Sequence, residues 1–240
     1  AQELEHRTYK AIVYNQTALD NRHIVNFANE KVTFKDSRAT PIQAGVEYLP
    51  SLLGILASCN VERGVTNFVC KNLVEVKETI DIDKDINAGN FLLLNEFSDV
   101  RVAVGINSKT SIAEGESEDM KYIDIIETMD LIADDIRNTF KEQYQGRYKN
   151  KLDYQMLFIS AVNTYFKALE LNDVLDNMYS NIANVDVNAQ RKAWAAIKPE
   201  AEFWDDTKVR NTSYKRNVYL AGDIKILGAM ESLQFNISIF

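Results

Sequence analysis

The chain has 240 residues and a net charge of −8 at pH 7, with a pI near 4.9. This acidic balance argues against nucleic acid as the main partner, because nucleic-acid-binding proteins carry a basic surface. Hydrophobic residues make up 46% of the sequence, which is enough for a packed core, and no apolar run approaches the roughly 18 residues needed to cross a bilayer.

The first strands are short and rich in β-branched and aromatic residues. Tyr9–Tyr14 and His23–Ala28 are predicted strands, and Val32–Phe34 is predicted to form a hairpin with the second of them. No apolar segment follows the polar opening residues, so we expect no secretory signal there. Because the sequence opens without methionine and directly on a strand, we expect it to be part of a longer protein.

A helix is predicted next. Thr40 is a suitable N-cap, Pro41 fits the first helical position, and the predicted helix runs to about Asn60 with a kink or break at Pro50. Cys59 falls at its end. With Cys70 as the only other cysteine, the pattern favours reduced, buried thiols over a disulfide framework.

Short elements alternate through the next part of the chain. Further strands are predicted at 68–70 and 73–76, a short helix at 83–88, and a hairpin from 91–94 and 100–104. Residues 108–118 are polar and acidic and are predicted to form a loop. This alternation of strands and helices indicates a layered α/β fold for the first half of the chain, and it looks incomplete.

Two adjacent helices dominate the second half. One apolar stripe of the first helix comprises Tyr122, Ile125, Ile126, Met129, Ile132, Ala133, Ile136, Phe140 and Tyr144. The second helix has its stripe on residues 152–169. Gly146 suits a C-terminal cap, and Asn150 with Asp153 can cap the second helix. The short connection between them predicts antiparallel neighbours.

The remaining elements are one helix and two strands. Asp186–Ile197 is a predicted helix stopped by Pro199, 200–211 is a predicted polar loop, and 218–227 is a predicted strand. The closing segment, 233–240, alternates apolar and polar residues as a half-buried strand does. Its apolar face consists of Leu233, Phe235, Ile237 and Ile239.

Motifs for catalysis or metal binding are missing from the sequence. His6 and His23 are the only histidines, and no zinc, P-loop, GxSxG or GxGxxG pattern occurs. Asp134 and Asp135 are adjacent, so on a helix they diverge by about 100° and cannot act as a carboxylate pair. We therefore predict no catalytic residue, no cofactor and no metal. A serine nucleophile with His23 as its base remains an alternative.

The first long helix also has a charged face, and two interpretations stay open for it. The face is either solvated surface or a docking surface for a basic neighbour, where its residues would form charge contacts between subunits. Its charged side chains are Asp124, Glu127, Asp130, Asp134, Arg137 and Lys141.

Several segments together resemble the contractile tail sheath proteins of phages and phage-like bacteriocins. Residues 131–140 (LIADDIRNTF), followed by Tyr144-Gln-Gly-Arg147, resemble a helix and turn of the family's C-terminal domain. Gly105–Asn107, Phe158–Leu169 and Ile226–Glu231 resemble three further stretches of that domain in the same order. Residues 23–29 and 62–67 resemble stretches of its middle domain, which has a subtilisin-like layout. Arg147 stands where the family usually has lysine.

The resemblance implies two domains. Residues 1–106 would be the end of the middle α/β domain and 107–240 the C-terminal domain, in which an antiparallel helix pair packs on a small mixed sheet. The family members are longer, so the chain would be the C-terminal part of a sheath protein. No triad is present, so protease activity is not carried over.

The resemblance also implies a structural role. Sheath subunits stack as rings around a tail tube, exchange terminal strands, and contract without a nucleotide. The expected partners are other copies of the chain, tube protein and baseplate or terminator proteins, without nucleic acid or membrane insertion. The expected location is a virion or phage-like tail assembled in the bacterial cytoplasm. The face Leu233, Phe235, Ile237 and Ile239 would form the exchanged strand. A binding domain that takes a peptide on its strand edge is a further alternative.

Overall fold

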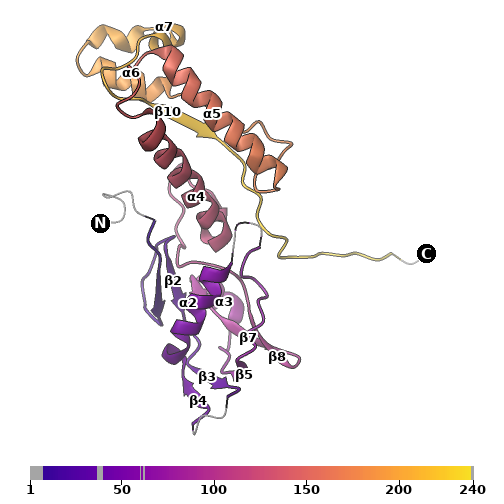
Figure 1. Ribbon diagram of the computed structural model, residues 1–240. Helices are drawn as coiled ribbons and strands as arrows, with labels where there is room; N and C mark the ends of the chain where they lie inside the picture. The colour runs from indigo at the N-terminus through magenta and orange to yellow at the C-terminus, as the bar shows by residue number, and fades with distance from the viewer. Residues whose placement is uncertain (1–7, 37–39, 60, 62, 239–240) are drawn as a thin grey trace. The chain divides into compact units, whose positions relative to one another are not determined.

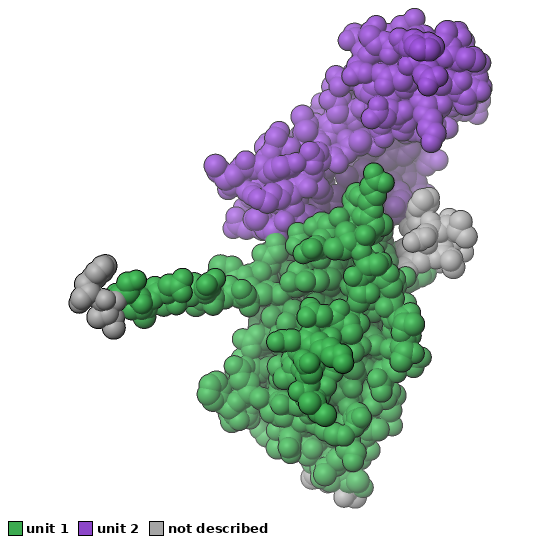
Figure 2. Space-filling model, turned by 180° about the vertical axis from the view of Figure 1, so that it is seen from behind, with its two compact units in different colours: residues 1–130, 228–240 green, residues 131–227 purple. Residues whose placement is uncertain are grey.

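The computed structural model describes residues 8–36, 40–59, 61 and 63–238 (Figure 1). It divides into two compact units (Figure 2). Unit 1 comprises residues 1–130 with 228–240, and unit 2 comprises residues 131–227. No helix in the described ranges is both long and apolar enough to cross a membrane. The division falls within a helix, whereas the domain boundary suggested by the family resemblance, 106–107, stays a prediction.

The first sheet of unit 1 is parallel. Strand β1 (Ala11–Tyr14) pairs with β2 (Ile24–Phe27), and β2 pairs with β6 (Asn90–Phe91). The predicted strands in these first two places are confirmed. Because β1 and β2 are parallel, the chain between them must return to the end of the sheet at which β1 begins.

A second sheet overturns the predicted hairpin. Strand β3 (Lys31–Phe34) turns away from β2 and pairs antiparallel with β4 (Ile42–Ala44) and β5 (Leu73–Val76). The buried Asn29 explains the change of direction. Its side-chain amide donates to the carbonyls of Lys77 and Leu93 and accepts from the Leu93 amide.

The predicted helix over 41–60 is correct only in its second half. Residues 42–44 form β4, Gly45–Tyr48 form a 3₁₀ turn, and helix α2 covers Leu49–Ser58. The kink or break predicted at Pro50 takes the form of a helix start, because α2 begins at Leu49 and Pro50 lies in its first turn, where no amide partner is needed. A Cβ on Gly45 would lie 1.8 Å from the Asn29 carbonyl oxygen, so this turn requires glycine.

The next helix and hairpin of unit 1 lie close to where the sequence predicts them. Helix α3 covers Ile82–Asn87, and β7 (Leu93–Glu96) forms the predicted hairpin with β8 (Asp99–Val102). The segment 68–70 forms only an isolated bridge, from Val69 to Arg101, and not a strand. The strands and α2 enclose one core. Its buried side chains include Val25, Phe27, Val32, Phe34, Tyr48, Leu52, Leu73, Val76, Phe91, Leu93, Val100 and Val102.

The long helix pair is present. Helix α4 covers Ile123–Thr139 and continues into a π turn (Phe140–Tyr144), and α5 covers Leu152–Leu171. In unit 2 the Tyr165 hydroxyl donates to Asp135 over 2.6 Å, and the Phe140 and Phe158 rings are 5.3 Å apart. Early residues of α5 therefore meet the end of the first helix, which confirms the antiparallel arrangement.

Of the two capping roles predicted in the connection between the helices, one is confirmed and one is wrong. Gly146 has a φ of +77°, as its predicted capping role requires. Asn150 does not cap α5, whose N-cap is Lys151 without a side-chain hydrogen bond. Instead the Asn150 amide donates to the carbonyls of Tyr214, Lys215 and Asn217, so it fixes a distant loop.

The end of unit 2 is a small layer on α5. Strand β9 (Ile182–Val185) precedes α6 (Val187–Ala195), and α7 (Asp206–Asn211) precedes β10 (Leu220–Asp223). The third predicted helix and the first closing strand are confirmed, although both are shorter. The prediction of a loop over 200–211 is wrong, because this segment contains a 3₁₀ turn (Pro199–Phe203) and α7, and β9 lies where the sequence predicts no strand. The described part of this sheet is a two-stranded antiparallel pair, not the mixed sheet that we expected.

Candidate assembly surfaces

The C-terminal segment 233–238, called the arm below, has no partner strand in the described part of the chain. Leu233, Phe235 and Ile237 expose 89%, 75% and 76% of their surface. Figure 2 shows the end of unit 1 standing out from the body as a narrow extension. The expectation of a strand over 233–240 is therefore not met within this chain, and Ile239 lies outside the described residues. Three large apolar side chains lie exposed on alternate positions.

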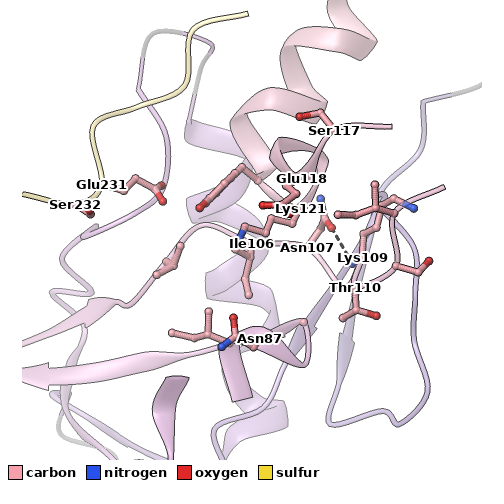
Figure 3. Close-up of a pocket in the computed structure, with 16 residues that line it drawn as sticks. Asn87, Ile106, Asn107, Lys109, Thr110, Ser117, Glu118, Lys121, Glu231 and Ser232 are labelled. Atoms are coloured by element: carbon pink, nitrogen blue, oxygen red, sulfur yellow. Dashed lines mark hydrogen bonds between the residues drawn. The ribbon is translucent and has the colours of Figure 1, made fainter. Parts of the chain in front are cut away.

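The root of the arm lies beside a cavity of about 430 Å³ in unit 1 (Figure 3). Glu231 and Ser232 enter from the C-terminal segment on one side, and Asn107, Lys109 and Lys121 lie across from them. Two of these residues, Asn107 and Lys109, already have hydrogen-bonding or ionic partners. The Asn107 side chain joins the Met120 carbonyl and the Lys109 amide, and the Lys109 ammonium pairs with Glu116. The cavity is therefore a hollow beside the arm and not an organised polar binding site.

The β9–β10 sheet of unit 2 has two unlike edges. On the outer edge of β9, Asn163 of α5 accepts from the Ala183 amide and donates to the Ala183 carbonyl. Ala183 is paired with Gly222 of β10. Since both backbone groups of Ala183 point away from β10, the pair is a non-hydrogen-bonded one, and the backbone of Gly222 points outward as well. Gly222 is exposed, and no strand of the described residues pairs with this outer edge of β10.

The carboxylates at the start of α4 bond within unit 1. Asp124 accepts from the backbone amide of Ala229 over 3.3 Å. Glu127 pairs with Lys10 over 2.6 Å, and Asp130 lies 3.1 Å from both Lys10 Nζ and His23 Nε2. These three predicted intersubunit residues therefore already have partners in their own chain.

The charged residues farther along the face lie in unit 2. Asp134 accepts from Arg137 over 2.6 Å, one helical turn along, and Lys141 in the π turn is exposed. A pair of this kind on an exposed surface contributes little to stability. Arg137 and Lys141 are exposed and Asp134 is partly exposed, and on this ground the three residues stay candidates for contact with a neighbour.

The surroundings of His23 bear on the hydrolase alternative. A cavity of about 240 Å³ beside it is lined by apolar side chains and Cys59 together with the polar side chains of Lys10, Arg22, Asn107 and Glu127, and no serine is among the described residues that line it. Burial raises the pKa of the thiols of Cys59 and Cys70, which keeps them neutral. The described residues also include no group of three or more ligands that could hold a metal ion.

Comparisons with known proteins agree on one family. Residues 116–240 match the family model described as the phage tail sheath C-terminal domain. The tail sheath protein of Clostridium phage phiCD119 is 26% identical over 242 residues, a match that includes 99% of this chain and 65% of that protein. The chain thus spans slightly less than two thirds of the curated relative.

Solved structures share the fold. The crystal structure of a sheath tail protein from Desulfitobacterium hafniense superposes with a TM-score of 0.66 at 19% identity, covering 77% of this chain and 44% of that one. The contracted helical sheath of the anti-feeding prophage gives a TM-score of 0.63 at 11% identity, covering 96% and 61%. The α+β architecture predicted for the C-terminal half is the architecture of these proteins.

Proposed function

The chain belongs to the phage tail sheath family, and on that premise we propose that it is a structural subunit of a contractile sheath that assembles by donating its arm to another copy. The observation that supports the proposal is that the described part of one chain contains both an unpaired strand-like segment and an unpaired strand edge.

The arm is suited to be the donor. An extended segment whose alternate residues are large and apolar gains free energy when it adds to a sheet, because its amides find partners and one face is buried. Each of Leu233, Phe235 and Ile237 is mostly exposed in the single chain. Burying such a side chain fully contributes about 1.5–3 kcal/mol, so three of them supply a substantial driving force.

The edge of β10 is suited to be the acceptor. Asn163 blocks the outer edge of β9 by satisfying both backbone groups of Ala183. The opposite edge has the outward-facing backbone of Gly222. A neighbour's arm that pairs there would extend the two-stranded sheet to three strands, and strand addition of this kind links subunits through main-chain hydrogen bonds.

Contraction is the second part of the proposal. Strand exchange keeps neighbouring subunits linked while other surfaces slide past one another. Asp134, Arg137 and Lys141 would supply contacts that change between the extended and contracted lattices. The assembled sheath would surround a tail tube and end on a baseplate or terminator, and its contraction would drive the tube through the target envelope.

Two settings fit this function. One is the tail of a phage virion, and the other is a phage-derived bacteriocin or injection machine. The likeness to the anti-feeding prophage sheath, which extends over 96% of this chain, favours keeping the second setting. In either case the subunit would assemble in the bacterial cytoplasm. Electron microscopy of native particles would separate the two settings by the presence or absence of a DNA-filled head.

The hydrolase alternative makes an opposite prediction. It requires turnover that His23→Ala abolishes, whereas the structural role requires none. The contact between His23 and Asp130 gives the histidine a structural use, since it links the start of β2 to α4. An ester and peptide substrate screen on the purified chain, with His23→Ala as the matched control, decides between them.

Electron microscopy tests the proposed function. The 240-residue chain at high concentration is compared with a chain that ends at Ser232. We expect hollow, regularly striated tubes from the 240-residue chain and dispersed particles from the shortened one. Dispersed particles from both would contradict self-assembly. Tubes from both would contradict the role of the arm.

A further inference from the structure

The five residues before the arm, 228–232, are attached to unit 1 at two points. The Ala229 amide donates to Asp124 at the start of α4 over 3.3 Å. The Thr66 hydroxyl donates to Oε1 of Glu231 over 2.5 Å. These two contacts join the C-terminal segment to residues that lie 105 and 165 positions earlier in the sequence. We call this pair of contacts the clamp.

The geometry around Thr66 directs its proton to Glu231. The Gly105 amide donates to the Thr66 hydroxyl oxygen over 2.8 Å, so the hydroxyl is held from one side and its own hydrogen is left for Glu231. The backbone of Gly105 packs closely against Val65 and Thr66. A Cβ there would be 2.8 Å from a methyl group of Val65, so only glycine brings its amide to Thr66 without a shift.

The clamp is shallow. All five residues from 228 to 232 are exposed, and Met230 has an exposed fraction of 103%. The attachment therefore consists of two hydrogen bonds, in which the Glu231 carboxyl is only partly desolvated and no apolar side chain is buried. Exposed hydrogen bonds of this kind open readily, whereas burial of apolar side chains would hold the segment in place.

Just before the clamp, the chain is held within unit 2 by several backbone contacts. The Leu227 amide donates to the Val174 carbonyl over 3.0 Å, Ile226 forms an antiparallel bridge with Leu175, and the Lys225 carbonyl accepts from the Asp176 amide over 2.9 Å. Beyond the clamp, residues 233–238 form no hydrogen bond with other described residues. The free part of the chain thus begins after residue 232 when the clamp is closed and after residue 227 when it is open.

We propose that the clamp gives the arm two lengths, and that opening it supplies slack to an exchanged arm when the lattice changes state. The inference rests on the proposed function. Five extended residues add about 16 Å of reach, at about 3.3 Å per residue. A subunit can therefore move relative to the copy that holds its arm without any loss of strand pairing.

Hydrogen exchange on the isolated 240-residue chain tests the clamp itself. We expect the Ala229 amide to exchange about tenfold more slowly than the amides of 233–238, and Glu231→Ala to remove most of this difference. Glu231→Gln keeps an acceptor for Thr66 and should retain the protection. Met230→Ala alters an exposed neighbour that forms no clamp contact and should change nothing. Equal exchange at 229 and 233–238 in the unsubstituted chain would overturn the proposal.

The same measurement on tubes tests the two lengths. We expect residues 233–238 to be protected in both extended and contracted tubes, and residues 228–232 to be protected in only one of these states. Identical protection of 228–232 in both states would overturn the inference while leaving strand exchange intact. Failure of the 240-residue chain to form tubes would contradict the proposed function, and the clamp would still be decided by the isolated chain.

Discussion

The two C-terminal segments that the sequence predicts as strands differ in structure. Within 218–227, residues Leu220–Asp223 pair with β9 and form β10. Residues 233–238 have the more regular alternation, yet they pair with nothing among the described residues. Residues Leu220–Asp223 form a strand, although 218–227 alternates less regularly, because the edge of β9 in the same chain is there to pair with them.

This difference separates two conditions for strand formation. Alternation determines which face of a segment is apolar, and a partner edge determines whether its amides and carbonyls are satisfied. The arm meets the first condition alone. A segment that meets the first condition and lacks the second is suited to pair with another chain. If the two segments differ in this way, substitutions in the arm should affect assembly and leave the fold of the single chain intact.

The largest effect is expected at the centre of the arm. Phe235→Asp places a charge on the apolar face, whose burial against a neighbour would then be strongly unfavourable. We expect no tubes at concentrations at which the unsubstituted chain assembles, as judged by sedimentation and electron microscopy. Asn236→Asp adds the same charge on the opposite face and serves as the control. Equal behaviour of the two variants would show that the face is not buried in the assembly.

A second experiment compares the arm with the core by stability. Phe27 is fully buried in unit 1, so Phe27→Ala should lower the free energy of unfolding by about 3–5 kcal/mol. Phe235 is 75% exposed, and Phe235→Ala should change that free energy by less than about 0.5 kcal/mol. Urea unfolding of the unassembled chain measures both. A large decrease in the free energy of unfolding for Phe235→Ala would mean that the arm packs against its own chain.

The acceptor edge can be altered by one hydrogen bond. Gly222→Pro removes the outward-facing amide of β10 and should weaken tube formation about tenfold. Gly222→Ala keeps the amide and is tolerated by the available space, because the added Cβ would lie 3.7 Å from the Phe166 ring. The critical concentration for assembly is the measurement. Equal critical concentrations for Gly222→Pro and Gly222→Ala would show that the arm does not pair with β10 at Gly222.

The smallest expected effect is a pH dependence of the clamp. Desolvation raises the pKa of the Glu231 carboxyl above its ordinary value of 4.5, the Thr66 hydrogen bond lowers it, Asp124 raises it and Lys121 lowers it. A raised pKa in the closed state means that closure favours the protonated form. The clamp should therefore be tightest at acidic pH and weaken as the pH rises through the raised pKa. Protection of Ala229, corrected for intrinsic exchange, should fall accordingly, and Glu231→Gln should abolish the trend.

Much of the fold could be predicted from local patterns. The apolar stripe of the long helix correctly marks Ile125, Ile126 and Ile132 as buried, and Gly146 correctly marks its end. The errors come from contacts between distant segments. The redirection of the chain by Asn29 and the attachment of a remote loop by Asn150 depend on carbonyls at least 48 residues away, and no local pattern contains them.

The candidate surfaces show the same limit. Alternation alone identifies the face containing Leu233, Phe235 and Ile237, since it requires no knowledge of the partner. The clamp could not be predicted, because the sequence does not show that Thr66 and Glu231 meet. The charge pattern of α4 likewise could not show that Lys10 and His23 approach Asp130.

A cryo-electron microscopy reconstruction of the assembled tube tests strand exchange most directly. It would show where residues 233–238 of each subunit lie. We expect them to form a strand on the outer edge of β10 of a different copy, with Phe235 and Ile237 buried in the contact. An arm that pairs with its own chain, or that stays unpaired in an intact tube, would contradict it.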